Sequence, residues 1–368
     1  MSSDIILVIV VGTALVFDFT NGFHDTANVV ATTISTRAMP PRLAVGFASL
    51  LNFAGAFISL KVAATVASGI VNANAVTPTT VFAGLIGAIG WNLITWYFGL
   101  PSSSSHALIG GLVGAVIAAD GTSAVVAGGL LGKVVVPALI APVLAFVTAA
   151  VGILTVYRVV GRLRPGPVTG GFKLGQVASG GLLALAHGTN DAQKTMGVIT
   201  LALVANGNIS SSNIHTPEWV VISAASAIAL GTYSGGWRII KTMGSRIIKM
   251  DSAQGFSAQG AGAAVILAAS HYGYPLSTTH VISGGVMGAG AAKRLSAVRW
   301  GVAGNIALAW VLTIPFAGVM GAATYGITRI FGTGAAGPLI VSIALLLLVA
   351  LVFARRVQHG SAITTAEA

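Results

Sequence analysis

The chain has 368 residues, of which 55% are hydrophobic and 7% are charged, and its mean hydropathy is +0.90. This composition excludes a water-soluble globular protein and indicates an integral membrane protein, because lipid must then be the main solvent of the chain. The net charge is +11, and the absence of cysteine excludes disulfides and thiolate metal sites. No polar run is long enough to bury a core of its own, so the whole chain is expected to form one membrane domain.

Apolar segments follow one another along nearly the entire chain. They cover residues 4–20, 43–71, 80–98, 106–119, 124–157, 177–206, 217–235, 256–272, 276–292, 299–328 and 335–354. They are too long for the strands of a membrane barrel, so we predict an all-α polytopic fold. At roughly 20 residues per crossing, with some segments bent or broken, we expect about ten to twelve transmembrane segments. Many of the 48 glycines lie within the segments, where small residues let helices approach closely.

The first polar motif, NGFHDTAN at 21–28, interrupts this apolar pattern. Asp18, Asn21, Asp25 and Asn28 recur at steps of three and four, so they line one face of a continuous helix. A carboxylate within the hydrocarbon costs several kcal/mol unless it faces a partner or a wet cavity, so this face is predicted to point inward. Histidine as a residue type can relay protons near neutral pH, so His24, next to Asp25, is a candidate proton relay.

The second polar motif, AHGTNDAQK at 186–194, places its polar residues in the same way. His187, Asn190, Asp191 and Lys194 form the corresponding stripe, and Lys194 is within reach of Asp191 at the i+3 position. An ion pair that only holds helices together is the alternative interpretation. The duplication of the motif favours a functional site.

Two hydroxyl-rich motifs follow, GLPSSSSH at 99–106 and GYPLSTTH at 273–280, each succeeded by a Gly-Gly pair. Pro101 and Pro275 are predicted to break a helix, and the Ser/Thr run is predicted to start the next one. A helix that begins within the membrane directs free N–H groups and a positive dipole end at the break, which suits an oxyanion. Ordinary helix caps at the membrane surface are the alternative. His106 and His280 are expected to serve the backbone rather than to relay protons.

The four motifs make up an internal repeat. Sliding the chain against itself superimposes Asn21 on His187, Asp25 on Asp191 and Asn28 on Lys194. We therefore predict a first membrane repeat at 1–157, a basic connector at 158–175, a second repeat at 176–356 and a polar tail at 357–368. Interrupted segments at matching places in two halves are typical of a transporter with its site near the middle of the membrane.

The positive charge does not indicate a nucleic-acid partner, because the basic residues cluster where apolar segments end. The clusters are Arg158, Arg162, Arg164 and Lys173, then Arg238, Lys241, Arg246 and Lys249, then Lys293, Arg294 and Arg299. By the positive-inside rule, the loop at 158–173 is predicted to be cytoplasmic in a multi-pass protein of the cell membrane.

Together, the two aspartate motifs and the two Pro-Ser/Thr-His motifs resemble the inorganic phosphate transporter (PiT) family over nearly the whole chain. The segment GTYSGGWR at 231–238 is also similar to the family's. The resemblance implies two inverted repeats with re-entrant hairpins, a homodimer in the lipid bilayer, and secondary uptake of inorganic phosphate by cation symport. It implies no enzymatic activity, and no cofactor is expected.

The resemblance also implies roles for individual residues. For phosphate binding it indicates Asp25, Asn28, Ser103, Ser104, Ser105, Asn190, Asp191, Ser277, Thr278 and Thr279. For the coupling ion or proton, the candidates are Asp18, Asn21, His24, Asp25, Asp191 and Lys194. No resident metal site is expected.

The sequence departs from the sodium-coupled pattern of the family, in which both motifs read close to GANDxAN. His24 precedes the first aspartate, and Gln193 and Lys194 follow the second. An ammonium group in the position that Asn28 holds in the first half repels a bound metal ion, which favours proton coupling. The motifs also resemble the bacterial low-affinity branch, which is linked to protons and metal-phosphate complexes.

Several alternatives stay open. Phosphate near neutral pH keeps a proton that an aspartate can accept, whereas sulfate keeps none, yet a sodium-coupled phosphate or sulfate permease remains the main alternative. A passive anion channel is disfavoured because paired acids repel a free anion. A membrane-embedded metal-dependent phosphatase or protease lacks its usual motifs, such as HExxH and GxSxG.

Overall fold

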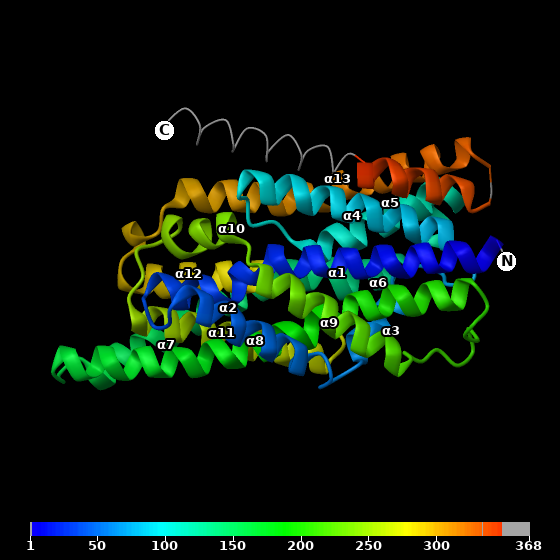
Figure 1. The fold of residues 1–368 in the computed structure, drawn as a ribbon. Helices are drawn as coiled ribbons and strands as arrows, with labels where there is room; N and C mark the ends of the chain where they lie inside the picture. The colour runs from blue at the N-terminus through cyan, green and yellow to red at the C-terminus, as the bar shows by residue number, and fades with distance from the viewer. Residues whose placement is uncertain (1, 333, 348–368) are drawn as a thin grey trace, which may run out of the picture.

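The computed structural model describes residues 2–332 and 334–347, which are almost entirely helical and contain no β-strand (Figure 1). The first half contains α1 (Ser2–Ser35), α2 (Pro41–Gly55), α3 (Lys61–Ser68), α4 (Pro78–Phe98), α5 (Ser104–Asp120), η1 (Thr122–Ala124), α6 (Ala127–Leu130), η2 (Leu131–Val135) and α7 (Val136–Val160). The second half contains α8 (Pro165–Ala205), α9 (Glu218–Ser234), α10 (Trp237–Lys241), η3 (Thr242–Arg246), α11 (Ser252–His271), α12 (Thr278–Lys293), η4 (Leu295–Ala297) and α13 (Trp300–Ile330). A further short helix covers Ala336–Leu347.

The predicted all-α membrane architecture is confirmed. Four helices in the described part of the chain are long and apolar enough to cross a membrane, and α9 with the segment Trp237–Arg246 forms a fifth candidate bent by 60°. The four are Asp4–Ser35, Pro78–Phe98, Ala127–Val160 and Trp300–Ile330. Other helices are shorter or contain the polar motifs. The number of ten to twelve crossings and the inverted relation of the repeats stay predictions.

The basic connector is shorter than the sequence suggested. Only residues 161–164 separate α7 from α8, because α8 begins at Pro165. Proline is favourable in the first turn of a helix, where its missing N–H has no partner to lose. Residues 165–175 are therefore the first turns of α8 and not a loop. The predicted tail at 357–368 and the end of the second repeat lie outside the described residues.

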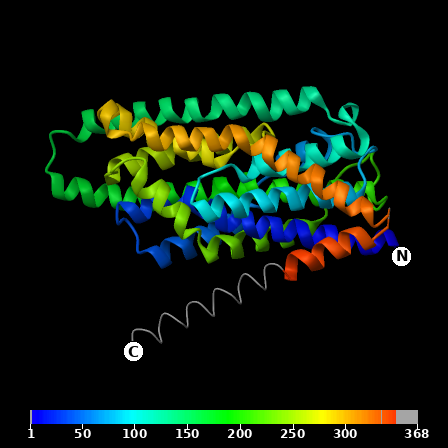
Figure 2. The same cartoon turned by 90° about the horizontal axis from the view of Figure 1, so that it is seen from above.

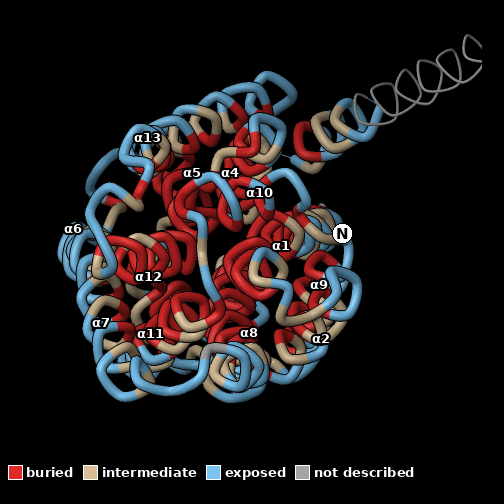
Figure 3. Tube along the Cα trace, turned by 90° about the vertical axis from the view of Figure 1, so that its left-hand side faces the viewer, coloured by how far each residue is buried: buried red, intermediate tan, exposed pale blue. Residues whose placement is uncertain are grey.

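The two halves exchange their helices. The main partner of α1 is α9 from the second half, whereas α8 packs against α2 and α3 from the first half. Likewise α13 packs on α4 and α5, and α7 packs on α11 and α12. Viewed along the bundle, α1, α5, α8 and α12 lie in the buried interior, with α7 and α13 toward the outside (Figure 3). The two repeats thus form one intertwined bundle.

Glycine makes the closest helix crossings possible, at corresponding places in the two halves. A Cβ atom on Gly231 of α9 would lie 2.1 Å from the backbone oxygen of Phe19 in α1. A Cβ atom on Gly55 of α2 would lie 2.2 Å from the backbone oxygen of Leu185 in α8. Phe19 and Leu185 occupy matching positions of the repeat. The first glycine of the GTYSGGWR segment is therefore explained by helix packing.

We predict that Gly22→Ala lowers the melting temperature of the purified protein, whereas Gly12→Ala in the same helix leaves it unchanged or raises it. A Cβ atom at Gly22 would meet the backbone oxygen of Ile228 at 2.3 Å, and nothing lies within 4 Å of one at Gly12. Without a clash, alanine stabilises a helix interior by up to about 1 kcal/mol relative to glycine. A thermal melt of both variants in one detergent makes the comparison, and equal melting temperatures would contradict the crossing.

Candidate functional site

Both predicted helix breaks are present, and they have the same form. The helix α4 ends at Phe98, Gly99 takes a left-handed conformation with φ 66°, and α5 begins at Ser104. In the second half, α11 ends at His271, Gly273 has φ 75°, and α12 begins at Thr278. Positive φ values of this kind favour glycine. At two places inside the bundle, one helix therefore ends and another begins a few residues later.

The first hydroxyl of each run caps its own helix. The Ser103 hydroxyl accepts a hydrogen bond from the backbone N–H of His106 at 3.1 Å, and Ser277 accepts one from His280 at 3.3 Å. Both are standard N-cap bonds. The capping alternative considered for the sequence therefore applies to these two serines, and the following hydroxyls remain for other contacts.

Asp25 of α1 lies between the two helix starts. Its Oδ2 accepts a hydrogen bond from Ser104 of α5 at 2.7 Å, and the hydroxyl of Thr278 of α12 lies 3.4 Å from the same oxygen. Its Oδ1 is 2.7 Å from His24 Nδ1. Asn21 joins this group, because its Oδ1 lies 2.6 Å from the Ser104 hydroxyl. These five predicted residues are buried and lie in one network.

Asp191 of α8 approaches the same place from the second half. Its Oδ2 accepts a hydrogen bond from Thr278 at 3.1 Å and lies 3.1 Å from His187 Nε2. Its Oδ1 bonds the ammonium group of Lys194. The Thr278 hydroxyl therefore lies between the two carboxylates and links the two aspartate motifs.

Lys194 connects the two broken segments. Its ammonium group donates to Ser105 of α5 at 2.5 Å and to the backbone oxygen of Leu276, just before α12, at 2.6 Å. With Asp191 these make three acceptors, which equals the number of protons that an ammonium group donates. Lys194 is buried and fully hydrogen-bonded.

Asn28 has the matching role in the first half. Its Nδ2 donates to Thr279 at 2.9 Å and lies 3.3 Å from the Thr278 hydroxyl. Asn28 of the first repeat thus reaches a hydroxyl of the second, as Lys194 of the second repeat reaches Ser105 of the first. The two positions are equivalent in sequence, but one carries a full positive charge and the other none.

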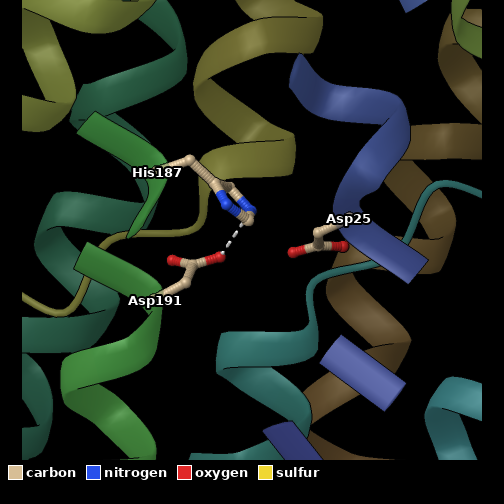
Figure 4. A group of neighbouring side chains, drawn as sticks. All are labelled: Asp25, His187 and Asp191. Atoms are coloured by element: carbon tan, nitrogen blue, oxygen red, sulfur yellow. Dashed lines mark ion pairs between the residues drawn. The ribbon is translucent and has the colours of Figure 1, made fainter. Parts of the chain in front are cut away.

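Asp25, His187 and Asp191 form the one group, among the described residues, whose ligand atoms could together hold a metal ion (Figure 4). One atom from each of the three side chains lies within 4.8 Å of the others, and all three residues are buried. Two carboxylates and an imidazole suit a divalent cation such as Zn²⁺ or Mn²⁺. The sequence prediction contained no metal site, so this cluster adds a possible cation position next to the hydroxyls.

Other predicted residues lie at the edge of this network. Asn190 donates to Ser270 at 2.8 Å and to the backbone oxygen of Tyr274 at 3.1 Å. These bonds attach α8 to the end of α11 and to the segment between α11 and α12. Both carboxylate oxygens of Asp18 are buried and make no hydrogen bond of good geometry within the part of the chain that the structure describes, although Thr195 and Asn21 are near.

The two motif histidines that were expected to be structural pack against each other. The rings of His106 and His280 lie edge to face with centroids 4.7 Å apart, and His280 also stacks on Trp310 at 4.0 Å. This contact joins α5, α12 and α13. It is consistent with the structural role expected for both histidines.

Sequence reasoning missed the partners that orient the histidines of the site. His187 Nδ1 lies 3.2 Å from Asn52 Oδ1, and Asn52 Nδ2 donates to Thr232 at 2.8 Å. The Nε2 atom of His24 lies 3.2 Å from the hydroxyl of Thr95. Asn52 could have been found from the sequence, because it is an isolated asparagine in an apolar segment and a buried amide needs a partner.

We predict that Lys194→Met destabilises the protein strongly and that Asp191→Asn added to it recovers much of the loss. Removing one partner of a buried ion pair leaves an uncompensated charge, at a cost of about 3–5 kcal/mol. Thermal or denaturant unfolding of the two single variants and the double variant measures the coupling. Additive effects of the two changes would mean that the pair contributes nothing of its own.

Comparison with known proteins identifies the family of the chain. The profile of the phosphate transporter family matches residues 21–169 and 162–321. The solved structure titled "The sodium-dependent phosphate transporter" superposes with a TM-score of 0.80 at 25% identity, covering 88% of this chain and 99% of the other.

Relatives named as probable low-affinity inorganic phosphate transporters align over most of the chain. The protein of Mycobacterium tuberculosis (strain CDC 1551 / Oshkosh) is 53% identical over 327 residues, which are 89% of this chain and 78% of the relative. Those of Rhizobium meliloti and Bacillus subtilis are 50% and 42% identical, each over 87% of this chain and 96% of the relative. These relatives are transporters rather than enzymes, and the chain belongs to the phosphate transporter family.

Proposed function

We propose that the protein takes up inorganic phosphate as a secondary active transporter coupled to protons. The observation that carries this proposal is that Ser104 and Thr278, from two broken helices, donate to Asp25 and Asp191. The next hydroxyls, Ser105 and Thr279, accept from Lys194 and Asn28 of the same two aspartate motifs. Hydroxyl groups and helix starts suit the phosphate oxygens, and a carboxylate can accept the proton that phosphate retains. The names of the relatives support the same substrate.

Charge compensation supports symport rather than a passive channel. Two buried carboxylates repel an incoming anion unless positive charge neutralises them. In the second half Lys194 supplies that charge permanently, and in the first half His24 supplies it when protonated. A proton on the first site is then enough to balance the pair, which fits proton coupling.

Sodium coupling is the alternative, since the similar solved structure is titled as sodium-dependent. The residue that argues against it is Lys194. Its ammonium group contacts a carboxylate, a hydroxyl and a backbone oxygen, which are the kinds of ligand that a small hard cation uses. A second alternative, uptake of a metal-phosphate complex, is supported by the cluster of Asp25, His187 and Asp191.

We propose an orientation in which the basic end of the bundle faces the cytoplasm. All three basic clusters belong to this end. Asp251 joins Lys293 of α12 to Tyr157 of α7, at 3.6 Å and 3.3 Å, and Arg299 bonds the backbone oxygen of Ser245 at 3.1 Å. The positive-inside rule then favours a cytoplasmic turn between α7 and α8 in the cell membrane. A homodimer, implied by the resemblance to the family, belongs to the same proposal.

The first test is radiolabelled phosphate uptake into proteoliposomes, with an inward proton gradient in sodium-free buffer and excess sulfate as competitor. We expect accumulation that sulfate does not reduce. Asp25→Asn should abolish it, because the side chain keeps its size but loses its charge, whereas Asp251→Asn at the exposed end should not. Uptake by Asp25→Asn equal to that of the native protein would rule out the carboxylate mechanism. If phosphate is not accumulated under a proton or a sodium gradient, sulfate becomes the preferred substrate.

The test of the coupling ion is Lys194→Asn, which gives the second half the residue that the first half carries at this position. We expect the variant to lose proton dependence or to gain sodium dependence, because a bound cation can replace the ammonium group. Its melting temperature should then rise with sodium but not with choline, and this readout works even if transport is lost. Unchanged coupling, with no effect of sodium on the melting temperature, would assign Lys194 a structural role only.

A further inference from the structure

A groove of about 600 Å³ lies at the turn between α7 and α8, away from the aspartates of the transport site. Its walls are apolar and include Leu163, Val168 and the rings of Phe172 and Phe256, whose centroids are 5.7 Å apart. Arg164, immediately before α8, also lines it. None of the residues that bind Asp25 or Asp191 belongs to the groove, so a ligand here is separate from the transported ion.

Basic residues flank the groove lining in the sequence. Arg158 and Arg162 are exposed at the end of α7 and in the turn, and Lys173 is half-buried on the first part of α8. No aspartate or glutamate lies between Asp120 and Asp191 in the sequence. The nearby Asp251 already contacts Tyr157 and Lys293. Arg164 in an apolar groove, with three further basic residues within nine positions of it in the chain, therefore complements a ligand with an anionic head and a hydrocarbon body.

The position of the groove determines which ligand of that kind it meets. The turn between α7 and α8 protrudes at one end of the long bundle, opposite the end where the chain starts (Figures 1 and 2). Helix ends of a membrane bundle lie at the level of the lipid headgroups. A basic pocket between helices at this level is a typical binding place for an anionic headgroup.

We propose that the groove binds one anionic phospholipid, represented by phosphatidylglycerol. The lipid phosphate pairs with Arg164, and one acyl chain lies against Phe172 and Phe256. Arginine suits this role because its planar guanidinium group binds two phosphate oxygens at once. The bound lipid covers apolar surface at the turn that joins the two repeats.

The test is native mass spectrometry of the full-length protein released from bilayers of equal parts phosphatidylglycerol and phosphatidylcholine. We expect preferential retention of one phosphatidylglycerol. Arg164→Ala should lower this retention about fivefold, as expected for one cation at a lipid surface, and Arg164→Lys should keep part of it. Phe172→Ala should lower retention of the same lipid. Arg246→Ala, in another basic cluster of the chain, is the control and should leave retention unchanged.

Several results would overturn the proposal. Equal retention of the two lipids would mean that the groove is ordinary lipid-facing surface. Displacement of phosphatidylglycerol by millimolar inorganic phosphate would identify a site for the free anion. Lipid retention unchanged in Arg164→Ala, together with loss of a dimer, would make the groove an interface between two copies. Melting temperatures and gel-filtration profiles close to those of the native protein show that each variant folds, and phosphate uptake is measured separately.

Discussion

The interaction on which the rest of the site depends is the neutralisation of two carboxylates inside a bundle that lipid surrounds. Ionised Asp25 and Asp191 cannot stay in a dry interior without nearby positive charge and hydrogen-bond donors. Each has a cationic or titratable neighbour on its own helix, His24 for the first and Lys194 with His187 for the second. Each also accepts a hydroxyl from the start of a broken helix. These requirements explain why the polar residues are grouped so tightly within otherwise apolar segments.

The exchange of helices between the halves is what brings these groups together. Because α7 and α13 pack on the broken segments of the opposite half, neither repeat can close its own site. The hydrogen bonds cross in the same way, from Asn28 to Thr279 and from Lys194 to Ser105. Close crossings at Gly22, Gly55, Gly188 and Gly231 allow α1 and α8 to lie deep enough in the bundle for their carboxylates to share Thr278. The duplicated helix crossings therefore both pack the bundle and bring the polar side chains of the site together.

The difference between the halves is as informative as their likeness. An exact copy of the first motif would place a neutral amide at position 194, and both carboxylates would then need a mobile cation. The ammonium group of Lys194 makes one of these cations a permanent part of the protein. In the proposed mechanism, one fixed and one exchangeable positive charge couple phosphate to a single kind of mobile cation, and His24, 2.7 Å from Asp25, is the group proposed to accept a proton.

The sequence by itself determined the membrane class, the two duplicated motifs, the breaks after Gly99 and Gly273, and the stripe of polar residues on α1. These follow from local rules, because helix periodicity and the conformations of glycine and proline need no knowledge of distant residues. Tertiary structure alone decided which residues meet. It linked Thr278 to both aspartates and placed Asn52 beside His187. The structure also shows Ser103 and Ser277 as helix caps and most of the basic connector as helix. The contacts of Thr278 with the aspartates and of Asn52 with His187 join residues far apart in the chain, and their geometry depends on how closely the helices of the two halves cross.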